Sequence, residues 1–267
     1  MAGYNHSQVW LAEFVGTTIL VLLGLGGIAN GVLPGTKGHG FGILGVALSF
    51  ALGIFIAQQC VGHISGFFNP AIALAGAVVG NIHWTHFWIC FSAEFVGGFF
   101  ASIIVWISYF PHFQSLEQVD PTCTCCDLET HVFCTRPSAI KLYWLYCFWA
   151  ECFLTFLLTY GAFTISDQGK LVITDAPQTS LYKTGLQPLL IGFLVFGLIL
   201  CGGGTTGPAL NPARDLAPRF AHWILPIPGK GPSEWWYSWV PVVAPCVGGV
   251  LGGLFAKSMK HMLVAGL

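Results

Sequence analysis

The sequence predicts an all-α membrane protein with six transmembrane helices and two re-entrant half-helices in an inverted repeat of three plus three spans. Three observations predict this fold class. Charged residues make up 8% and apolar residues 55% of the 267 residues, against about 25% and 45–50% in soluble domains. Several apolar runs reach the roughly 20 residues that span a bilayer. The triplet Asn-Pro-Ala interrupts such runs twice, at residues 69–71 and 211–213.

Six apolar segments are long enough to cross the membrane. The first begins too far from any basic n-region to be a signal peptide, and it lacks a convincing cleavage site. Its motif Ala-Glu-Phe-Val-Gly-Thr at residues 12–17 also has a counterpart, Ala-Glu-Cys-Phe-Leu-Thr, at residues 150–155. We therefore expect a single membrane domain over 1–267, with a first repeat at 1–110, a connecting loop at 111–142 and a second repeat at 143–267. The expected spans are Val9–Ile28, Phe41–Val61, Phe87–Tyr109, Tyr143–Ile165, Leu186–Gly203 and Trp236–Ala256.

Two further segments, Pro70–Gly80 and Pro212–His222, are too short to span the bilayer. Each begins with proline, which suits the first turn of a helix, behind an asparagine, which is a good N-cap. Each is expected to be a half-helix that enters the membrane and stops. Because each half has three spans, the second half inserts from the opposite side, and the half-helices meet N-terminus to N-terminus. Their positive dipole ends repel cations, and the Asn69 and Asn211 amides remain as donors for a passing oxygen.

These motifs together resemble the major intrinsic protein (aquaporin) family over nearly the whole chain. The matches are Ala12-Glu13-Phe14, Gly62-His63-Ile64-Ser65-Gly66, Asn69-Pro70-Ala71, Glu151 and Gly207-Pro208-Ala209-Leu210-Asn211-Pro212-Ala213-Arg214-Asp215. Asp215 directly after Arg214 is similar to the glycerol-conducting branch. The segment Trp235–Pro245 is similar to facilitators of lactic acid bacteria, some of which pass lactic acid. The resemblance implies a right-handed bundle of six helices and two half-helices, packed as a homotetramer with one pore per subunit and with both Asn-Pro-Ala boxes in the pore.

The resemblance also carries over the four positions of the family's constriction, by their spacing from the boxes: Phe50, Ile199, Pro208 and Arg214. Arg214 matches the family's invariant arginine. Ile199 stands where water-only channels have histidine and glycerol facilitators have glycine, and Pro208 stands where glycerol facilitators usually have an aromatic residue. Such a filter lets a polyol bond its hydroxyl groups to Arg214 while its CH edge slides over carbon. Ile199 is bulkier than glycine, which leaves the pore width open, and core or lipid-facing packing remains the alternative for Phe50 and Ile199.

Acidic residues inside membrane spans are costly and usually functional. The resemblance implies structural support by Glu13, Glu151 and Asp215, with the two glutamates accepting backbone N–H groups of the re-entrant loops; a proton relay is the alternative for the glutamates. Glu94, where the family more often has a neutral amide, is interpreted as a protonated or hydrogen-bonded contact between helices, with proton sensing as the alternative. The first box departs in length, because residues 65–69 are one residue shorter than the family pattern. This puts the geometry of that half in question.

Ten cysteines form two groups. Six lie in or beside the spans and are interpreted as small apolar fillers. The polar loop holds the other four, where a disulfide, free thiols and a metal site remain open: Cys123, Cys125, Cys126 and Cys134. The chain has no nucleotide loop, no paired carboxylates in the expected pore and no Ser-His-Asp context, so we predict no enzyme, no cofactor and no catalytic metal. It has no basic patch that would indicate a nucleic-acid partner.

We expect a passive channel for small uncharged solutes, chiefly glycerol and water, with urea and lactic acid as further candidates, that excludes ions and protons. A lactic acid channel of the same family is one alternative. A coupled secondary transporter, which can also use broken helices, is the alternative of another class, although Asn69 and Asn211 stand where a carrier is expected to show a titratable pair. We expect the protein to lie among the lipids of the plasma membrane. Positive charges tie between the two sides, so cytoplasmic termini rest on the resemblance alone.

Overall fold

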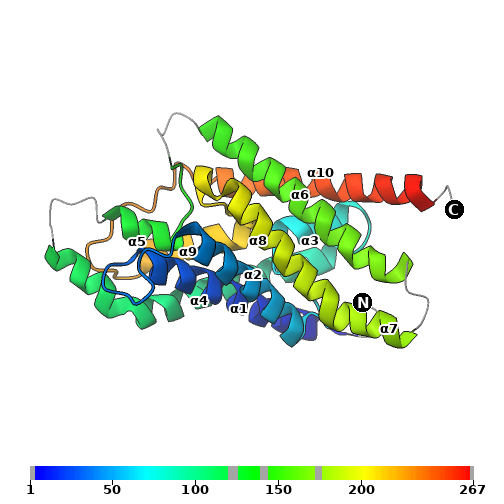
Figure 1. The fold of residues 1–267 in the computed structure, drawn as a ribbon, viewed down its shortest axis with the longest axis horizontal. Helices are drawn as coiled ribbons and strands as arrows, with labels where there is room; N and C mark the ends of the chain where they lie inside the picture. The colour runs from blue at the N-terminus through cyan, green and yellow to red at the C-terminus, as the bar shows by residue number, and fades with distance from the viewer. Residues whose placement is uncertain (1–3, 120–125, 139–143, 172–175, 265–267) are drawn as a thin grey trace.

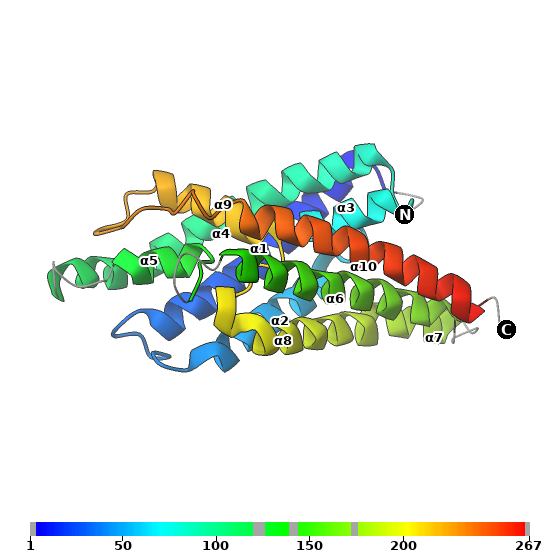
Figure 2. The same cartoon turned by 90° about the horizontal axis from the view of Figure 1, so that it is seen from above.

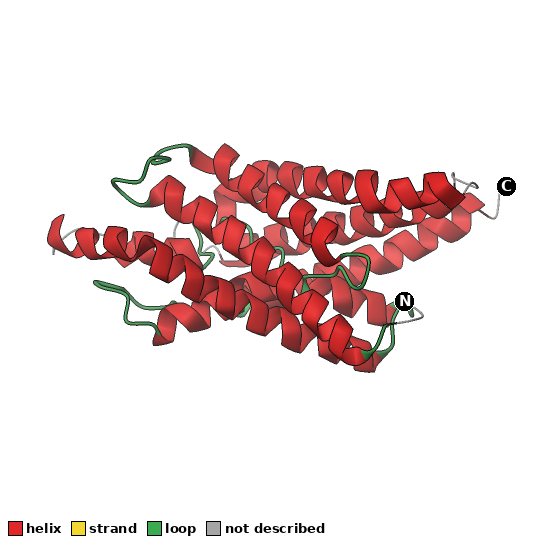
Figure 3. Cartoon of the chain, turned by 90° about the horizontal axis from the view of Figure 1, so that it is seen from below, coloured by secondary structure: helices red, strands yellow, loops and turns green. Residues whose placement is uncertain are grey.

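The computed structural model describes residues 4–119, 126–138, 144–171 and 176–264. Within these residues every regular element is a helix (Figure 3). Large apolar side chains such as Leu44, Trp88 and Phe193 point outward from the bundle, which suits a surface that contacts lipid rather than water. In the described part of the chain, six helices are long and apolar enough to cross a membrane: His6–Val32, Gly42–Val61, Trp84–Ser115, Trp144–Asp167, Gln178–Thr206 and Val240–Met262. The predicted all-α membrane fold is therefore confirmed.

The long helices form two halves with the same packing pattern (Figures 1 and 2). In the first half, α1 (His6–Val32) packs against both α2 (Gly42–Val61) and α4 (Trp84–Val119). In the second half, α6 (Trp144–Leu171) packs in the same way against α8 (Gln187–Thr206) and α10 (Val240–Val264). Helices α2 and α8 join the two halves along one side of the bundle.

The two short helices α3 (Pro70–Val78) and α9 (Pro212–Ile224) lie between the long helices. They join the two halves on the side opposite α2 and α8. Helix α3 packs mainly against α10, and α9 mainly against α4, so each half-helix crosses to the opposite half. Glycine allows this close approach, because a Cβ on Gly98 would lie 2.9 Å from the Ala213 carbonyl oxygen and a Cβ on Gly249 would lie 2.8 Å from that of Ala71. Any larger residue at either glycine would push a half-helix away from the centre.

Both half-helices begin as their sequences indicate. Asn69 and Asn211 are the N-caps, in extended backbone conformations, and proline occupies the first turn of each helix. Helix α3 ends at Val78, and Gly80 follows with a φ of 87°, a left-handed conformation that glycine adopts without strain. The half-helices are thus fixed at their starts by local sequence and along their lengths by packing.

The segment that joins the halves contains helix as well as loop. Helix α4 continues through Pro111 to Val119, and α5 (Cys126–Phe133) follows within the described residues. Helix α7 (Ala176–Leu181) and one π-helical turn (Tyr182–Leu186) lead directly into α8. Helix α5 lies at one end of the bundle, and the N- and C-terminal ends of the chain both lie at the other end, with α7 (Figures 1 and 2).

Candidate pore, its constriction and its supports

The two Asn-Pro-Ala boxes meet at the centre of the bundle through a reciprocal pair of hydrogen bonds. The Asn69 Nδ2 donates to the Leu210 carbonyl oxygen at 2.8 Å, and the Asn211 Nδ2 donates to the Phe68 carbonyl oxygen at 2.7 Å. Phe68 and Leu210 have φ values of 50° and 54°, rare for residues other than glycine. In each box, the residue directly before the asparagine adopts this left-handed conformation, and its carbonyl oxygen accepts the hydrogen bond from the asparagine of the opposite box.

Each asparagine side chain therefore makes hydrogen bonds with both its oxygen and its nitrogen atom. Its oxygen caps its own half-helix, by accepting the Ala71 N–H at 3.0 Å in the first box and the Ala213 N–H at 2.9 Å in the second. One of the two amide protons bonds the opposite loop, and the second amide proton is left over. Both asparagines line a cavity, so the remaining protons are placed to bond an oxygen atom inside it.

Two buried glutamates hold the loops in front of the boxes. Glu151 accepts three donors: the Thr206 hydroxyl and the Ala209 N–H, both at 2.8 Å, and the Leu210 N–H at 3.0 Å. Glu13 makes the matching set in the first half, with the Ser65 hydroxyl at 2.5 Å, the Phe67 N–H at 2.9 Å and the Phe68 N–H at 2.7 Å. Each carboxylate thereby satisfies loop N–H groups that would otherwise be buried without partners.

The shortened first box keeps this network intact. Gly66 alone separates the hydroxyl donor Ser65 from the first N–H donor, whereas two residues, Gly207 and Pro208, do so in the second half. The first loop is thus one residue shorter between the hydroxyl group and the first N–H group that bind its glutamate. In its place, the Gln58 side chain donates to the Gly66 carbonyl oxygen at 2.6 Å and fixes the short turn.

Two cavities follow one another through the bundle, and the boxes line the first of them. The channel cavity, of about 240 Å³, extends from the boxes towards Gln58, Ser166 and Gln187. The vestibule, of about 370 Å³, opens next to α5 and is bounded by the loop 134–138. Among the described residues, four line both cavities and so mark the passage between them: Phe50, Ile199, Pro208 and Arg214. The structure thus brings together the four residues singled out by their spacing from the boxes.

Arg214 is the polar side of this passage. Its Nε and Nη1 atoms are buried and have no hydrogen-bond partner in the described part of the protein. Its Cζ atom lies 5.0 Å from the centre of the Phe50 ring, within the range of a cation–π interaction. Buried N–H groups are nearly always satisfied by protein or water, so these donors face a ligand or water in the passage. The other three residues supply carbon only.

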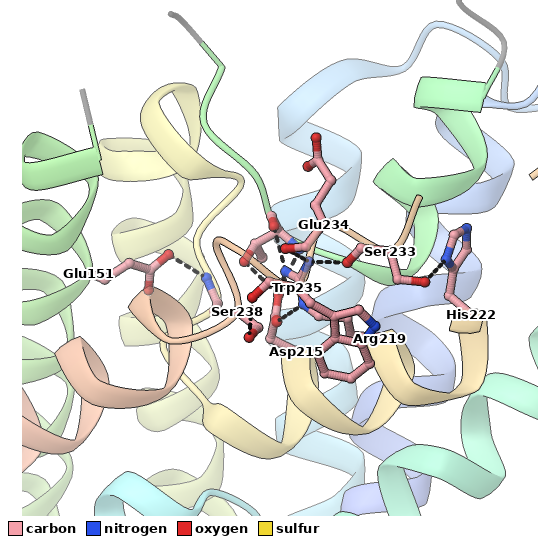
Figure 4. A network of polar contacts seen from close by, with 10 residues as sticks. Glu151, Asp215, Arg219, His222, Ser233, Glu234, Trp235 and Ser238 are labelled. Atoms are coloured by element: carbon pink, nitrogen blue, oxygen red, sulfur yellow. Dashed lines mark hydrogen bonds and ion pairs between the residues drawn. The ribbon is translucent and has the colours of Figure 1, made fainter. Parts of the chain in front are cut away.

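Asp215 does not line either cavity but anchors α9 from behind. Its carboxylate pairs with Arg219, from Oδ1 to Nε at 2.9 Å and from Oδ2 to Nη2 at 3.1 Å, and both side chains are fully buried. The same carboxylate accepts the Thr135 N–H at 2.7 Å and its hydroxyl at 2.6 Å. Arg219 in turn donates to the carbonyl oxygens of Thr135 and Ser233 at 2.8 Å (Figure 4). This network ties the half-helix that carries Arg214 to the loop 134–138 at the vestibule and to the loop at Ser233 that follows α9.

The sequence patterns did not identify Arg219, nor Lys230, which caps the C-terminal end of α9. Lys230 donates to three carbonyl oxygens at that end, those of His222, Trp223 and Leu225, at 2.6–2.9 Å, where a positive charge stabilises the helix dipole. Partial burial lowers the pKa of the Lys230 ammonium. The available signal was the rarity of charge: in a chain with 8% charged residues, an aspartate and an arginine four residues apart on a half-helix indicate a buried ion pair.

Cys134 is the member of the cysteine-rich loop that the structure resolves in detail. It is buried, it is a free thiol and it lines the vestibule. Burial raises the pKa of its thiol to about 12. Cys123 and Cys125, and the side chain of Cys126, lie outside the described residues.

A bundle of six apolar helices around two opposed half-helices, with a passage lined by one unpaired guanidinium, defines a membrane channel. The chain belongs to the Major intrinsic protein family, whose model matches residues 3–256. This membership makes it an integral membrane transport protein and not an enzyme.

The chain is similar to bacterial facilitators over nearly its whole length. It is 40% identical to "Probable glycerol uptake facilitator protein" of Thermotoga maritima, over 92% of this chain and 96% of that protein. It is 36% identical to "D/L-lactic acid transporter" of Lactiplantibacillus plantarum, over 92% of this chain and 94% of that protein. The X-ray structure of the aquaglyceroporin from Plasmodium falciparum has a TM-score of 0.79 with 24% sequence identity, covering 98% of this chain and all of the other, which shows the shared fold.

Proposed function

We propose that the protein is a passive channel that conducts glycerol and water. The observation that carries this proposal is the passage between the two cavities, with Arg214 donors on one side and the carbon surfaces of Phe50, Ile199 and Pro208 on the others. A polyol has hydroxyl groups along one edge and CH groups along the other, so both edges find a matching surface. The similarity to the probable glycerol uptake facilitator of Thermotoga maritima supports the same substrate.

Beyond the passage, the two asparagines offer the next donors. The spare amide protons of Asn69 and Asn211 line the same cavity, so a hydroxyl group that leaves Arg214 meets them without returning to bulk water. Further on, the cavity is lined largely by aliphatic and aromatic side chains such as Leu20, Ile54 and Ile191. Glycerol thereby moves in single file past a few donors on a mostly apolar wall.

Cations and protons are excluded by the positive potential at the centre, and anions by the loss of hydration against the apolar walls. The N-termini of α3 and α9 face the same point, and each carries the positive end of a helix dipole. Arg214 adds a full positive charge in the passage. Cations are repelled by this potential, and a chain of water molecules is reoriented at the asparagines, which interrupts proton transfer.

A coupled carrier finds less support. Among the described residues that line the channel cavity, the only ionisable side chain of Asp, Glu, His, Lys or Arg is Arg214. A proton- or sodium-coupled carrier needs a group there that binds the coupling ion, and asparagine at both boxes supplies none that titrates.

Stopped-flow light scattering on proteoliposomes tests the proposal. After a glycerol gradient is imposed, vesicles that contain the protein should re-swell faster than empty vesicles, at a rate proportional to the gradient. Equal rates with raised water flow would leave a water channel, and a glycerol flux that saturates or follows a pH gradient would instead indicate a carrier.

Lactic acid is the second candidate, favoured by the similarity to the lactic acid transporter of Lactiplantibacillus plantarum and by the aliphatic pair Ile199 and Pro208. The anion would lose its hydration against carbon walls, which costs several kcal/mol even beside Arg214. The neutral acid avoids that cost, and with a pKa of about 4 it makes up roughly one molecule in a thousand at pH 7. Labelled uptake into vesicles should therefore rise about tenfold per pH unit between pH 7 and pH 5, while glycerol flux should stay constant. A lactate flux that does not depend on pH would exclude permeation by the neutral acid.

We further propose that the channel is a homotetramer in the plasma membrane with cytoplasmic termini. The resemblance to the family supports all three statements. The two termini lie at one end of the bundle (Figure 1), so a single accessibility measurement at either end assigns both. Cross-linking in native membranes tests the oligomeric state.

A further inference from the structure

Glu94 on α4 is a buried acid that the pore as described does not use. Its side chain is fully buried. Its Oε1 atom accepts the Asn69 backbone N–H at 2.9 Å, so it contacts the residue that caps α3 and lines the pore. Its Oε2 atom is buried and receives no N–H or O–H from the described protein. Glu13 accepts the N–H of the preceding residue, Phe68, at 2.7 Å, so the two carboxyl groups lie side by side on consecutive backbone N–H groups.

Within the described residues, no positively charged side chain pairs with either acid. Helix α1 contributes Glu13. Helix α4 itself adds the buried thiol of Cys90 and, one turn further back, His86, whose buried Nε2 has no hydrogen-bond partner among the described residues. The loop at 65–69 and α3 carry no ionisable side chain. Helix α9 meets α4 through apolar groups, with Gly98 near Ala213 and with Phe220 against two phenylalanines of α4. The cluster around Glu94 is therefore two carboxyl groups and their neutral hydrogen-bond donors.

We propose that Glu13 and Glu94 share one proton, and that the protonated pair positions Asn69 in the pore. Two carboxylates side by side and out of water repel each other strongly, and one shared proton removes the repulsion. Glu13 already accepts three donors from the loop, which favours its charged form. The proton therefore lies on Glu94 Oε2, from which it is donated to Glu13. The free Oε1 of Glu94 then accepts the Asn69 N–H, as observed.

The second half of the molecule lacks this device. Gly97 approaches the main chain of α1 at Phe14, and Gly248 approaches α6 at Cys152 in the same way, so these two glycines occupy corresponding positions. Three residues before them stand Glu94 and Pro245. Proline has no side-chain acceptor, so the second box is held by its single glutamate. The extra acid, Glu94, thus occurs in the half whose loop is one residue shorter. The shorter loop offers fewer backbone contacts to hold Asn69 in place.

Because the pair shares a proton, the support that Glu94 gives to Asn69 depends on pH. It is present at low and neutral pH and is lost at high pH. When the pH is high enough to remove the proton, the pair gains a second negative charge, Glu94 loses its bond to Glu13, and the repulsion moves Glu94 away from Asn69. The α3 end of the pore then loses its alignment with the α9 end. Flux should accordingly fall at alkaline pH and recover when the pH is lowered, since acid returns the proton.

The inference concerns the pore proposed above, but infrared spectroscopy tests it whatever the channel conducts. Purified wild-type protein at neutral pH should show the C=O stretch of a protonated carboxylic acid that is absent from Glu94→Gln. Identical spectra in this region would overturn the shared proton. Glutamine can donate its amide to Glu13 and accept the Asn69 N–H, so it should preserve the pore.

Two variants separate positioning from mere packing. Glu94→Gln should keep glycerol flux within about twofold of wild type and remove its loss at alkaline pH, because glutamine does not titrate. Glu94→Leu fills the same space but accepts nothing, and should reduce flux about tenfold by leaving the Asn69 N–H unpaired. If Glu94→Leu misfolds, the pH profile of Glu94→Gln still decides. A Glu94→Gln profile that falls at alkaline pH as wild type does would contradict the proposal.

Discussion

Replacement of Asp215 by asparagine should destabilise the protein far more than the same replacement in an exposed ion pair. Asp215 accepts four hydrogen bonds with its two oxygens, two from Thr135 and two from Arg219. Asparagine has one acceptor oxygen, and it leaves the Arg219 charge buried without an anion. Removal of one partner of a buried pair costs about 3–5 kcal/mol.

Asp167 provides the matched control. It pairs with Lys260 at 3.0 Å, close to the 2.9 Å of the buried pair, but the two side chains are 29% and 46% exposed. An exposed pair contributes about 0–1 kcal/mol. At roughly 2–4 °C per kcal/mol for a chain of this size, Asp215→Asn should lower the thermal midpoint by about 10 °C, and Asp167→Asn by at most a few degrees.

Fluorescence-detected size exclusion after heating, on both variants in the same detergent, measures the two midpoints. Glycerol flux should also fall in Asp215→Asn, because the half-helix that carries Arg214 loses its tie to the loop 134–138 at the vestibule. Equal midpoints for the two variants would refute the assignment of Asp215 as the anchor of α9.

Three further predictions follow from the same site. Arg214→Val should admit larger solutes and a proton leak in voltage-clamped membranes, because the passage loses its positive charge and widens; unchanged selectivity in a folded variant would contradict the filter assignment. Lys230→Met should cost about 1–2 kcal/mol, measured as a lower thermal midpoint than that of Lys183→Met, which alters an exposed lysine; equal midpoints would contradict the cap. Alkylation of Cys134 should stay slow until the pH nears 12, because burial keeps the thiol protonated, whereas the exposed Cys60 should react readily; mass spectrometry of the labelled peptides would show comparable rates if the thiol were accessible and ionised.

Much of the fold follows from local sequence. Composition and span length account for the six helices, and the Asn-Pro start accounts for both half-helices, because capping and the missing proline N–H act within a few residues. The triple glycine at residues 202–204 is helical, since α8 continues to Thr206, although consecutive glycines usually indicate a loop. In a membrane, the cost of unpaired backbone groups keeps glycine helical where packing permits it.

The candidate site was predictable in part. Spacing from the boxes singled out the four residues that the structure places between the two cavities. Arg219 and Lys230 were not identified, because Arg219 binds backbone carbonyls of two loops and Lys230 folds back onto the last carbonyls of α9, and both contacts depend on tertiary packing. The contact between Glu94 and Asn69 escaped for the same reason, since it joins residues on different elements.

The central claim is that glycerol crosses through the passage at Ile199. Two neighbouring residues of α8 test it directly: Ile199 is 4% exposed and lines both cavities, whereas Leu200 is 40% exposed on the outer face. Tryptophan at position 199 should fill the passage, and tryptophan at position 200 should not reach it. In stopped-flow measurements, vesicles with Ile199→Trp should re-swell in glycerol as slowly as empty vesicles, while Leu200→Trp should match wild type. Wild-type rates in both variants would contradict the claim.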